Sequence, residues 1–277
     1  MHSTPALPSE TTIAIVGAGR LGGVLARALH AAGVEIVGPL RRGEPIPPVD
    51  LAILCVPDAA IPAAAESARA SAALIAHVSG ATGLDDVDLS IHPLQTLTGA
   101  ESPTVFRGVG AAIDGRTADD RARAARLATT LGLVPFRVDD AHRASYHAAA
   151  SFASNFVLTV LDAAEELAAT AGVDRAHLAP LVRQTVDNWT VSGAAAALTG
   201  PIARGDEETV ARQRAASAHL APLFDALAAS TRAIARTAPG SVVAAPGSAV
   251  AVPRSAVAAP GSAVAAPGSA TENEAHA

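Results

Sequence analysis

Residues 11–140 alternate short apolar strands with Ala-rich helical stretches, and this alternation restricts the chain to few folds. Several strands are nearly continuous apolar runs, as expected when helices cover both faces of a parallel sheet. We expect strands at Thr12–Val16, Val34–Gly38, Leu51–Val56, Leu74–Val78, Leu89–His92, Gly110–Ile113 and Val134–Val138. Helices fit between them at Leu21–Ala32, Ala60–Ala70 and Ala118–Leu131. This order predicts an α/β fold, with a Rossmann-type, doubly wound parallel sheet and right-handed crossovers.

The strand signals stop after Asp140, and the next part of the chain is helical throughout. The pattern predicts helices at Ala141–Thr170, Asp174–Leu198 and Asp206–Arg236. Asp174 and Asp206 fit as N-caps, and Gly172 stands where a helix would stop. Gly200 and Pro201 break the chain between two of the helices. We therefore expect a separate all-α domain after the sheet.

The C-terminal segment repeats a seven-residue unit close to AAPGSAV, marked by Pro239, Pro246, Pro253, Pro260 and Pro267. Regular Pro and Gly interrupt helices and strands, and Ala and Ser bury too little apolar surface to form a core. The sequence thus predicts a dinucleotide-binding domain at 11–140, a helical substrate or dimerisation domain at 141–237 and a disordered tail at 238–277.

Composition excludes several classes of function. The chain has 277 residues, a net charge of −6 and one cysteine, Cys55, so we expect neither a disulfide framework, a cysteine-rich zinc site nor another metal site. The acidic balance argues against nucleic acid as a partner. The N-terminal MHSTPALPSETT lacks the pattern of a signal peptide, and no apolar stretch is long enough to span a membrane. We expect a soluble, cytoplasmic protein.

The strongest motif is the turn after the first strand, Gly17-Ala-Gly19-Arg20-Leu21-Gly22. In a GxGxxG turn, the first glycine permits the sharp bend and the second lets the backbone approach a pyrophosphate. The third allows close packing of helix on strand. The following helix offers free N–H groups and a partial positive charge to the anion. A turn that binds nothing is the alternative, but its place in a βαβ unit favours a dinucleotide site.

The end of the second strand indicates which dinucleotide binds. An NAD site usually has an acidic residue there, but Glu35 comes early in the strand and Arg41 and Arg42 follow its end. Guanidinium groups suit a 2′-phosphate, so we expect NADP, with NAD less favoured. The alternative is a solvated arginine pair without a ligand.

Ligands of such sheets lie outside the carboxyl ends of the strands. The third strand ends at Cys55-Val56-Pro57-Asp58, where Val56 and Pro57 would touch the cofactor, Cys55 would be a core residue and Asp58 a helix cap. Ser79 and Gly80 follow the fourth strand, and His92 and Gln95 follow the fifth. We expect Ser79 and His92 to contact the substrate. His77 is either part of this space or a hydrogen-bonded histidine within the strand.

In the helical part, His147, Ser151 and Asn155 recur at spacings of four residues and form one polar stripe on an otherwise apolar helix. Burying such a stripe costs energy unless partners are present, and a cleft facing the cofactor would supply them. A solvent-facing stripe or a helix–helix hydrogen-bond network is the alternative. Farther on, Arg204 and Asp206 could close over an anionic substrate or form a capped turn.

Together these motifs resemble a known group. They are the glycine turn, His77-Val-Ser79-Gly80, His92-Pro93-Leu94-Gln95, Tyr146-His147-Ala-Ala-Ala and Thr199-Gly200-Pro201. Residues 11–236 resemble a bacterial family with a Rossmann-like NADP-binding domain and a C-terminal helical domain of unknown function. The chain is more distantly similar to pyrroline-5-carboxylate reductase, ketopantoate reductase, β-hydroxyacid dehydrogenases and deazaflavin-dependent NADP reductases. The resemblance implies an oxidoreductase that dimerises through the helical domain, with its active site in the interdomain cleft.

One departure from these relatives concerns the proton donor. Hydroxyacid dehydrogenases and ketopantoate reductases use a helix lysine, and this chain contains no lysine. His147, His92 and Tyr146 remain as proton donors, and His147 is the first choice because histidine titrates near neutral pH. Asn155, Ser151 and Ser79 would orient the substrate.

We therefore predict hydride transfer between NADPH and a small oxo acid or imino acid, with an anionic substrate. A nucleotide-binding sensor or partner subunit without catalysis is one alternative, because the expected lysine is missing. Hydride exchange between NADP and a second cofactor is another.

Overall fold

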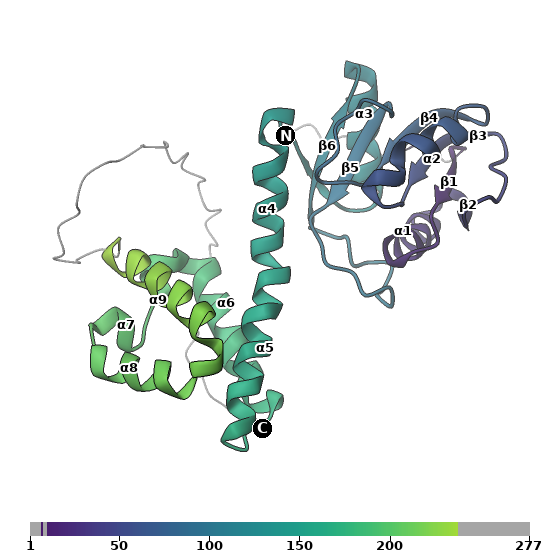
Figure 1. The fold of residues 1–277 in the computed structure, drawn as a ribbon. Coiled ribbons are helices and arrows are strands. Elements are labelled where there is room, and N and C mark those ends of the chain that lie inside the picture. The colour runs from purple at the N-terminus through teal and green to yellow at the C-terminus, as the bar shows by residue number, and fades with distance from the viewer. Residues whose placement is uncertain (1–6, 8–9, 238–277) are drawn as a thin grey trace, which may run out of the picture. The chain divides into compact units, whose positions relative to one another are not determined.

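The computed structural model describes Leu7 and residues 10–237 and divides the chain into two compact units at the start of α6, after Arg175 (Figure 1). The predicted tail at 238–277 lies outside the described residues. None of the described helices is both long and apolar enough to cross a membrane.

The first unit contains a seven-stranded sheet with the order β2-β1-β3-β4-β5-β6-β7. Its strands are β1 Thr12–Val16, β2 Glu35–Leu40, β3 Val49–Leu54, β4 Ala72–His77, β5 Leu89–Pro93, β6 Gly110–Gly115 and β7 Val134–Phe136. The three helices expected between strands are α1 Arg20–Ala31, α2 Ile61–Ala68 and α3 Ala118–Thr130. The predicted α/β class and Rossmann-type order of elements are confirmed.

The sheet is mostly parallel, and β6 is the exception. β6 runs antiparallel to β5, and β7 pairs with β6 in parallel. The segment between β5 and β6 contains turns and no helix. An antiparallel neighbour needs no helical crossover, so this strand departs from the all-parallel sheet that the apolar runs predicted.

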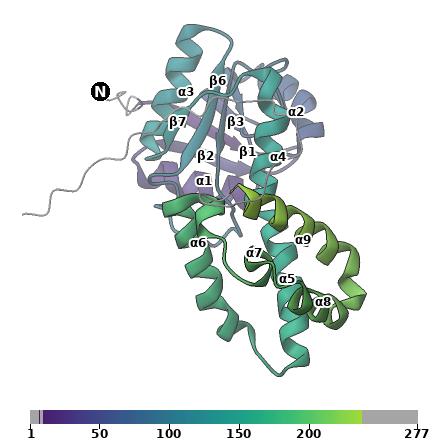
Figure 2. The same cartoon turned by 90° about the vertical axis from the view of Figure 1, so that its left-hand side faces the viewer.

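Helices cover both faces of the sheet, as the continuous apolar strands require. One core contains Leu25, Leu29 and Leu127 from α1 and α3 against Ile13, Ile53 and other strand residues. The other core packs Ile61, Ala65 and Ala68 of α2 against Ala52 and Leu54. Figure 2 shows α3 and α2 on opposite sides of the sheet.

Two further helices, α4 Arg143–Ala153 and α5 Asn155–Thr170, complete the first unit. The sequence predicted one helix over 141–170, but Ser154 interrupts it with φ −130° and ψ −75°. The Ser154 hydroxyl donates to the Ala150 carbonyl at 2.7 Å, the kind of back-bond that bends helices. The predicted stop at Gly172 is confirmed, because α5 ends at Thr170 and Gly172 has φ 69°.

The second unit is helical in its described residues, with α6 Arg175–Ala197, α7 Pro201–Arg204, α8 Glu207–Ala216 and α9 Ala221–Arg236. Asp206 caps α8 as predicted, accepting the Thr209 N–H at 3.1 Å. Gly193 adopts φ 73° within α6 and kinks it. The single helix expected over 206–236 is instead two, separated by a short 3₁₀ turn at Ala218–Leu220.

Candidate functional site

The glycine turn has the geometry that its sequence predicts. Gly17 has φ 117°, and a Cβ there would lie 2.3 Å from the Cys55 carbonyl oxygen. A Cβ on Gly22 would lie 2.0 Å from the Gly17 carbonyl oxygen, so only glycine lets α1 pack this close to the strand. A Cβ on Gly19 would meet nothing within 4 Å. The open space therefore lies at Gly19, where a pyrophosphate would approach the backbone.

Gly19 is the N-cap of α1 and has no side chain to accept a hydrogen bond from the first backbone N–H groups. The first turn of α1 contains no acidic residue either. The first N–H groups of a helix have no partner within it, and the helix dipole makes this end attractive to anions. Arg20 and Leu21 begin the helix at this point. The residues present fit a dinucleotide diphosphate.

The end of β2 brings the two arginines beside this turn. Val16 pairs with Leu40, and the Gly17 N–H donates to the Leu40 carbonyl at 2.8 Å, so Arg41 and Arg42 follow at the same edge of the sheet. Both side chains are exposed, and neither guanidinium has a hydrogen bond or ion pair within the described residues. Glu35 is the first residue of β2, at the opposite end of the strand. The geometry therefore offers cations at this edge.

Cys55, Val56 and Pro57 follow β3 beside the turn. A Cβ on Gly22 would lie 3.3 Å from the Cβ of Cys55, and burial raises the pKa of the Cys55 thiol to about 12. These contacts agree with the core role predicted for Cys55. Asp58 does not cap α2, whose N-cap is Ala60 without a side-chain bond, so that interpretation was wrong. The Asp58 side chain is exposed.

His77 is fully buried at the end of β4 and uses both ring nitrogens. Its Nδ1 accepts the Ser79 N–H at 3.2 Å, so Nε2 carries the hydrogen and donates to the Gly83 carbonyl at 2.9 Å. Burial lowers the pKa of His77, which keeps the ring neutral. Of the two interpretations of His77, the hydrogen-bonded strand histidine fits the structure.

The Ser79 hydroxyl is fully engaged in a turn. Its oxygen accepts the N–H groups of Ala81 and Thr82 at 3.1 and 3.0 Å and donates to the Thr82 hydroxyl at 3.0 Å. A hydroxyl has one donor and two lone pairs, so none is left for a substrate. The geometry gives Ser79 a turn-forming role in place of the substrate contact expected from the sequence.

His92 lies on β5 and contacts α4 through Tyr146. Its Nδ1 is 2.7 Å from the Tyr146 hydroxyl, and the two rings meet edge to face with centroids 5.5 Å apart. Phe136 of β7 also contacts the Tyr146 ring, with centroids 5.9 Å apart. The His147 ring lies 6.2 Å from His92, and a Cβ on Gly80 would come within 3.0 Å of both. Gly80 thus lets two histidines and a tyrosine converge.

These surroundings set the charge of His92 and Tyr146. Burial, followed by the neighbouring His147, lowers the pKa of His92 to about 4, so the ring is neutral at pH 7. Burial raises the pKa of Tyr146 to about 12, so its hydroxyl keeps its hydrogen. Neither group therefore readily exchanges a proton near neutral pH.

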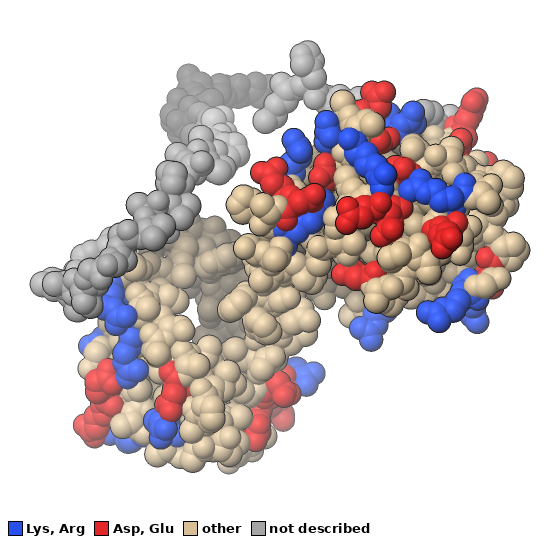
Figure 3. Space-filling model, turned by 45° about the horizontal axis from the view of Figure 1, so that its top comes forward, with Lys and Arg blue, Asp and Glu red and all other residues tan. Residues whose placement is uncertain are grey.

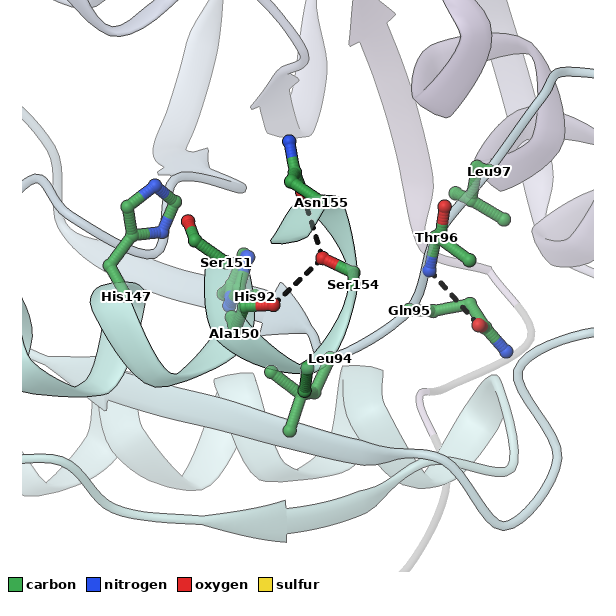
Figure 4. A pocket seen from close by; sticks show the side chains of 11 residues that line it. His92, Leu94, Gln95, Thr96, Leu97, His147, Ala150, Ser151, Ser154 and Asn155 are labelled. Carbon is green, nitrogen blue, oxygen red and sulfur yellow. Dashed lines mark hydrogen bonds between the residues drawn. The ribbon is translucent and has the colours of Figure 1, made fainter. Parts of the chain in front are cut away.

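A pocket of about 460 Å³ opens beside His92 in the first unit (Figure 4). Figure 4 shows His147, Ser151 and Asn155 on one side of the α4–α5 segment, with Thr96 and Leu97 on the loop opposite. The three residues of the predicted polar stripe therefore line one pocket, even though the helix breaks at Ser154. The full lining is His92, Leu94, Gln95, Thr96, Leu97, His147, Ala150, Ser151, Ala153, Ser154 and Asn155.

No acidic residue or arginine lines this pocket, so its polar character comes from neutral donors and histidines. The Ser154 hydroxyl oxygen lies 2.8 Å from the Asn155 side-chain oxygen, and its one hydrogen is shared between that oxygen and the Ala150 carbonyl. The Asn155 amide hydrogens stay available. The Ser151 hydroxyl has no hydrogen bond within the described residues. His147 is exposed. The pocket can bind and orient a small group rich in hydrogen-bond acceptors.

The loop that begins in the pocket continues to the glycine turn. Arg27 of α1 donates to the Gly99 carbonyl at 2.8 Å and to the Glu101 carbonyl at 3.2 Å. A Cβ on Gly99 would lie 3.6 Å from the Arg20 side chain. Leu94–Glu101 therefore connects the pocket with the start of α1 within one compact unit.

The structure brings together three of the four predicted catalytic residues, His92, His147 and Asn155, and leaves Ser79 outside the pocket lining. It also adds the His92–Tyr146 bond, Leu97 and Ser154. The Tyr146-His147 pair and the His92-Pro93-Leu94-Gln95 motif signalled part of this arrangement, and Gln95 lines the pocket beside His92 as expected. No pattern signalled Leu97 or the course of the loop beyond it. Arg204 and Asp206 belong to the second unit, where Asp206 caps a helix. The described residues contain no cluster of three His, Cys, Asp or Glu suited to a metal.

On the face of the first unit that Figure 3 shows, charged side chains do not form a large patch of one charge sign. Acidic and basic residues are interspersed there. A nucleic-acid site would need a continuous basic patch, and this face carries none.

Comparison with known families agrees with the predicted resemblance. Residues 109–231 match the family described as a domain of unknown function (DUF2520). The match spans part of the sheet, α3–α8 and most of α9, and confirms the resemblance stated for the C-terminal motifs. No curated protein sequence matches the chain.

Solved structures share the fold at low sequence identity. A proposed NADP oxidoreductase from Bacteroides fragilis is 22% identical, covers 81% of this chain and 99% of its own, and has a TM-score of 0.71. A protein from Thermotoga maritima is 21% identical, with coverages of 82% and 98% and a TM-score of 0.63. Pyrroline carboxylate reductase from Plasmodium falciparum, solved with NADP bound, is 9% identical, with coverages of 82% and 99% and a TM-score of 0.52.

Proposed function

We propose that this Rossmann-like protein is an NADP-dependent oxidoreductase that transfers hydride between NADPH and a small oxo acid or imino acid. The observation that carries the proposal is one connected arrangement in the first unit. The glycine turn and the arginine pair lie at one edge of the sheet, and the loop Leu94–Glu101 leads from α1 to the histidine pocket. The named oxidoreductases among the structural neighbours support the same activity.

The residues that would hold the cofactor follow from the geometry. The diphosphate would lie at the N-terminus of α1 beside Gly19, with Gly17 and Gly22 keeping the turn tight. Arg41 and Arg42 would bind the 2′-phosphate, because arginine matches phosphate geometry with paired donors. Val56 and Pro57 would pack against the dinucleotide. The bound nicotinamide ring supplies or accepts the hydride.

The protein must also orient the acceptor and provide a proton. We assign the proton to His147, because it lines the pocket and is exposed, whereas His92 is neutral and Tyr146 holds its hydrogen. Asn155 and Ser151 would donate hydrogen bonds to the acid group of the substrate. This division of roles needs no lysine.

The first test is cofactor binding, measured by calorimetry with NADPH and NADH. We expect NADPH to bind more tightly, and we expect Arg41→Ala and Arg42→Ala each to weaken NADPH roughly 10-fold while leaving NADH unchanged. Arg123→Ala on α3 removes the same charge from an exposed side chain and should change neither affinity. Equal affinity of the wild type for both dinucleotides would refute the NADP assignment, and no affinity for either would refute the function.

The second test is turnover. NADPH oxidation against a panel of oxo acids, cyclic imino acids and uncharged carbonyl compounds identifies the class of substrate. His147→Gln should reduce turnover at least 100-fold, within the range for general acid catalysis, while NADPH affinity stays at the wild-type value. NADPH binding without turnover on any compound would favour a sensor. Turnover that persists in His147→Gln would favour hydride exchange with a second cofactor, which needs no protein acid.

We also propose that the protein is a homodimer formed through its helices. Phe152 and Leu158 of the α4–α5 segment are 68% and 66% exposed, and Phe156 beside them is 49% exposed. Large apolar side chains grouped in this way mark interaction surfaces. Light scattering at micromolar concentration tests the assignment, and Phe152→Asp with Leu158→Asp should yield a monomer.

A further inference from the structure

The hydrogen bond between His92 and Tyr146 leaves one ring nitrogen open. Nδ1 of His92 faces the Tyr146 hydroxyl at 2.7 Å, and Nε2 has no partner among the described residues. Among the described residues, no fully buried side-chain nitrogen or oxygen lacks a hydrogen-bond partner. Because Nε2 has no partner, it is therefore in contact with solvent. Since His92 lines the pocket, Nε2 is the atom that a ligand would meet.

The direction of this hydrogen bond decides whether Nε2 of His92 acts as a hydrogen-bond donor or as an acceptor. A neutral imidazole has one N–H and one bare nitrogen, and a bond at one nitrogen fixes the state of the other. Tyr146 keeps its hydrogen at neutral pH and has no other acceptor within the described residues. The hydroxyl therefore donates to Nδ1, and the hydrogen of His92 lies on Nε2.

We infer that Tyr146 is a positioning residue that holds His92 as its Nε2–H tautomer and thereby turns His92 into a neutral hydrogen-bond donor for the substrate. The inference rests on the proposed function and identifies the kind of substrate atom that would contact Nε2 of His92. That atom is an acceptor, a carbonyl or carboxylate oxygen, and not an ammonium or another donor.

Packing around Tyr146 supports a fixed arrangement. The tyrosine ring makes edge-to-face contacts with both His92 and Phe136, at centroid distances of 5.5 and 5.9 Å. His92 and Phe136 are both paired in register with Ala112, on the two strands that flank β6. The Tyr146 ring of α4 contacts both of them. Such contacts restrict the hydroxyl to the neighbourhood of Nδ1. His77 shows the same tautomer, held there by backbone groups.

The tautomer is measured directly by nuclear magnetic resonance of protein labelled with ¹⁵N-histidine at pH 7.5. We expect His92 to show a protonated Nε2 and a bare Nδ1. In Tyr146→Phe, the ratio of the Nδ1–H form to the Nε2–H form should rise roughly 2- to 10-fold, which corresponds to the loss of one hydrogen bond. Ser145→Ala removes a hydroxyl from the preceding, exposed residue of α4 and should leave the ratio unchanged.

Two results would overturn the inference: a protonated Nδ1 on His92 in the wild type, or an unchanged ratio in Tyr146→Phe. If Tyr146→Phe does not fold, the wild-type spectrum still decides the tautomer. Neither measurement needs cofactor or turnover, so failure of the proposed function is seen separately, as missing NADPH binding.

A paired substitution tests the role of the donor in the reaction. Gln at position 92 places an amide N–H near the Nε2 position, and Asn places it near the Nδ1 position. On the substrate found by the panel, His92→Gln should retain at least 10-fold more turnover than His92→Asn. Equal losses in the two variants would contradict a donor at Nε2.

Discussion

Alanine substitutions in the glycine turn should separate the stability of the protein from its affinity for the cofactor. Gly19 has an extended backbone, with φ −79° and ψ −173°, and a Cβ there would meet nothing within 4 Å. Gly19→Ala should therefore change the free energy of unfolding by less than about 1 kcal/mol, the usual range for an N-cap change. The new methyl group would occupy the space assigned to the diphosphate.

The loss of affinity follows from the hydrogen bonds that this methyl group displaces. A hydrogen bond to a charged group is worth about 1.5–3 kcal/mol, so losing one weakens NADPH binding roughly 10- to 100-fold. Gly22→Ala differs because its Cβ would lie 2.0 Å from the Gly17 carbonyl oxygen, and α1 must move away from the strand. Overpacking of this kind costs about 1–3 kcal/mol.

The neighbouring Gly23 provides the matched control. It lies within α1, and a Cβ there would come no closer than 3.6 Å to another residue, the Arg27 side chain. Gly23→Ala should stabilise the protein by about 0.5–1 kcal/mol through helix propensity and leave NADPH affinity unchanged. Urea unfolding and calorimetry measure the two quantities for all three variants. A Gly19→Ala protein that is stable and binds NADPH as the wild type does would refute the placement of the diphosphate.

Two further predictions concern stability. The Arg143 guanidinium is 6% exposed and bonds Asp140 at 2.5 Å and Asp114 at 3.5 Å, so Arg143→Met should destabilise the protein by about 3 kcal/mol, because it leaves Asp114 without its cation. In contrast, Arg175→Met breaks an exposed pair and should leave the urea midpoint nearly unchanged. The lowered pKa values of His77 and His92 mean that the unfolded chain binds more protons than the folded protein once the pH falls below about 6.5. Unfolding free energy should therefore be highest above pH 6.5 and fall as the pH approaches 4, and His92→Asn should reduce that fall; an identical pH profile in the variant would contradict the environment assigned to His92.

Local patterns were enough to predict most of the sheet and the glycine turn. Strand Thr12–Val16 has the predicted bounds, because its apolar run and the glycine turn after it are both encoded by a few consecutive residues. The contacts of Gly17 and Gly22 follow from the same short motif. Two features of the fold were missed. The antiparallel direction of β6 depends on the loop before it, and the break at Ser154 depends on one hydroxyl and its carbonyl.

The candidate site shows the same limit at the level of single side chains. Sequence spacing predicted that His147, Ser151 and Asn155 share a face, and the pocket contains all three. Spacing could not predict that Ser79 uses its whole hydrogen-bonding capacity in a turn, since the same Ser-Gly pair could also expose its hydroxyl. Nor could it predict that Tyr146 reaches His92, because the two residues lie on different elements and 54 positions apart. The chemistry of the pocket therefore depends on which partner each polar group finds, near or far along the chain, since a side chain whose donors and acceptors are already paired is no longer available to a ligand.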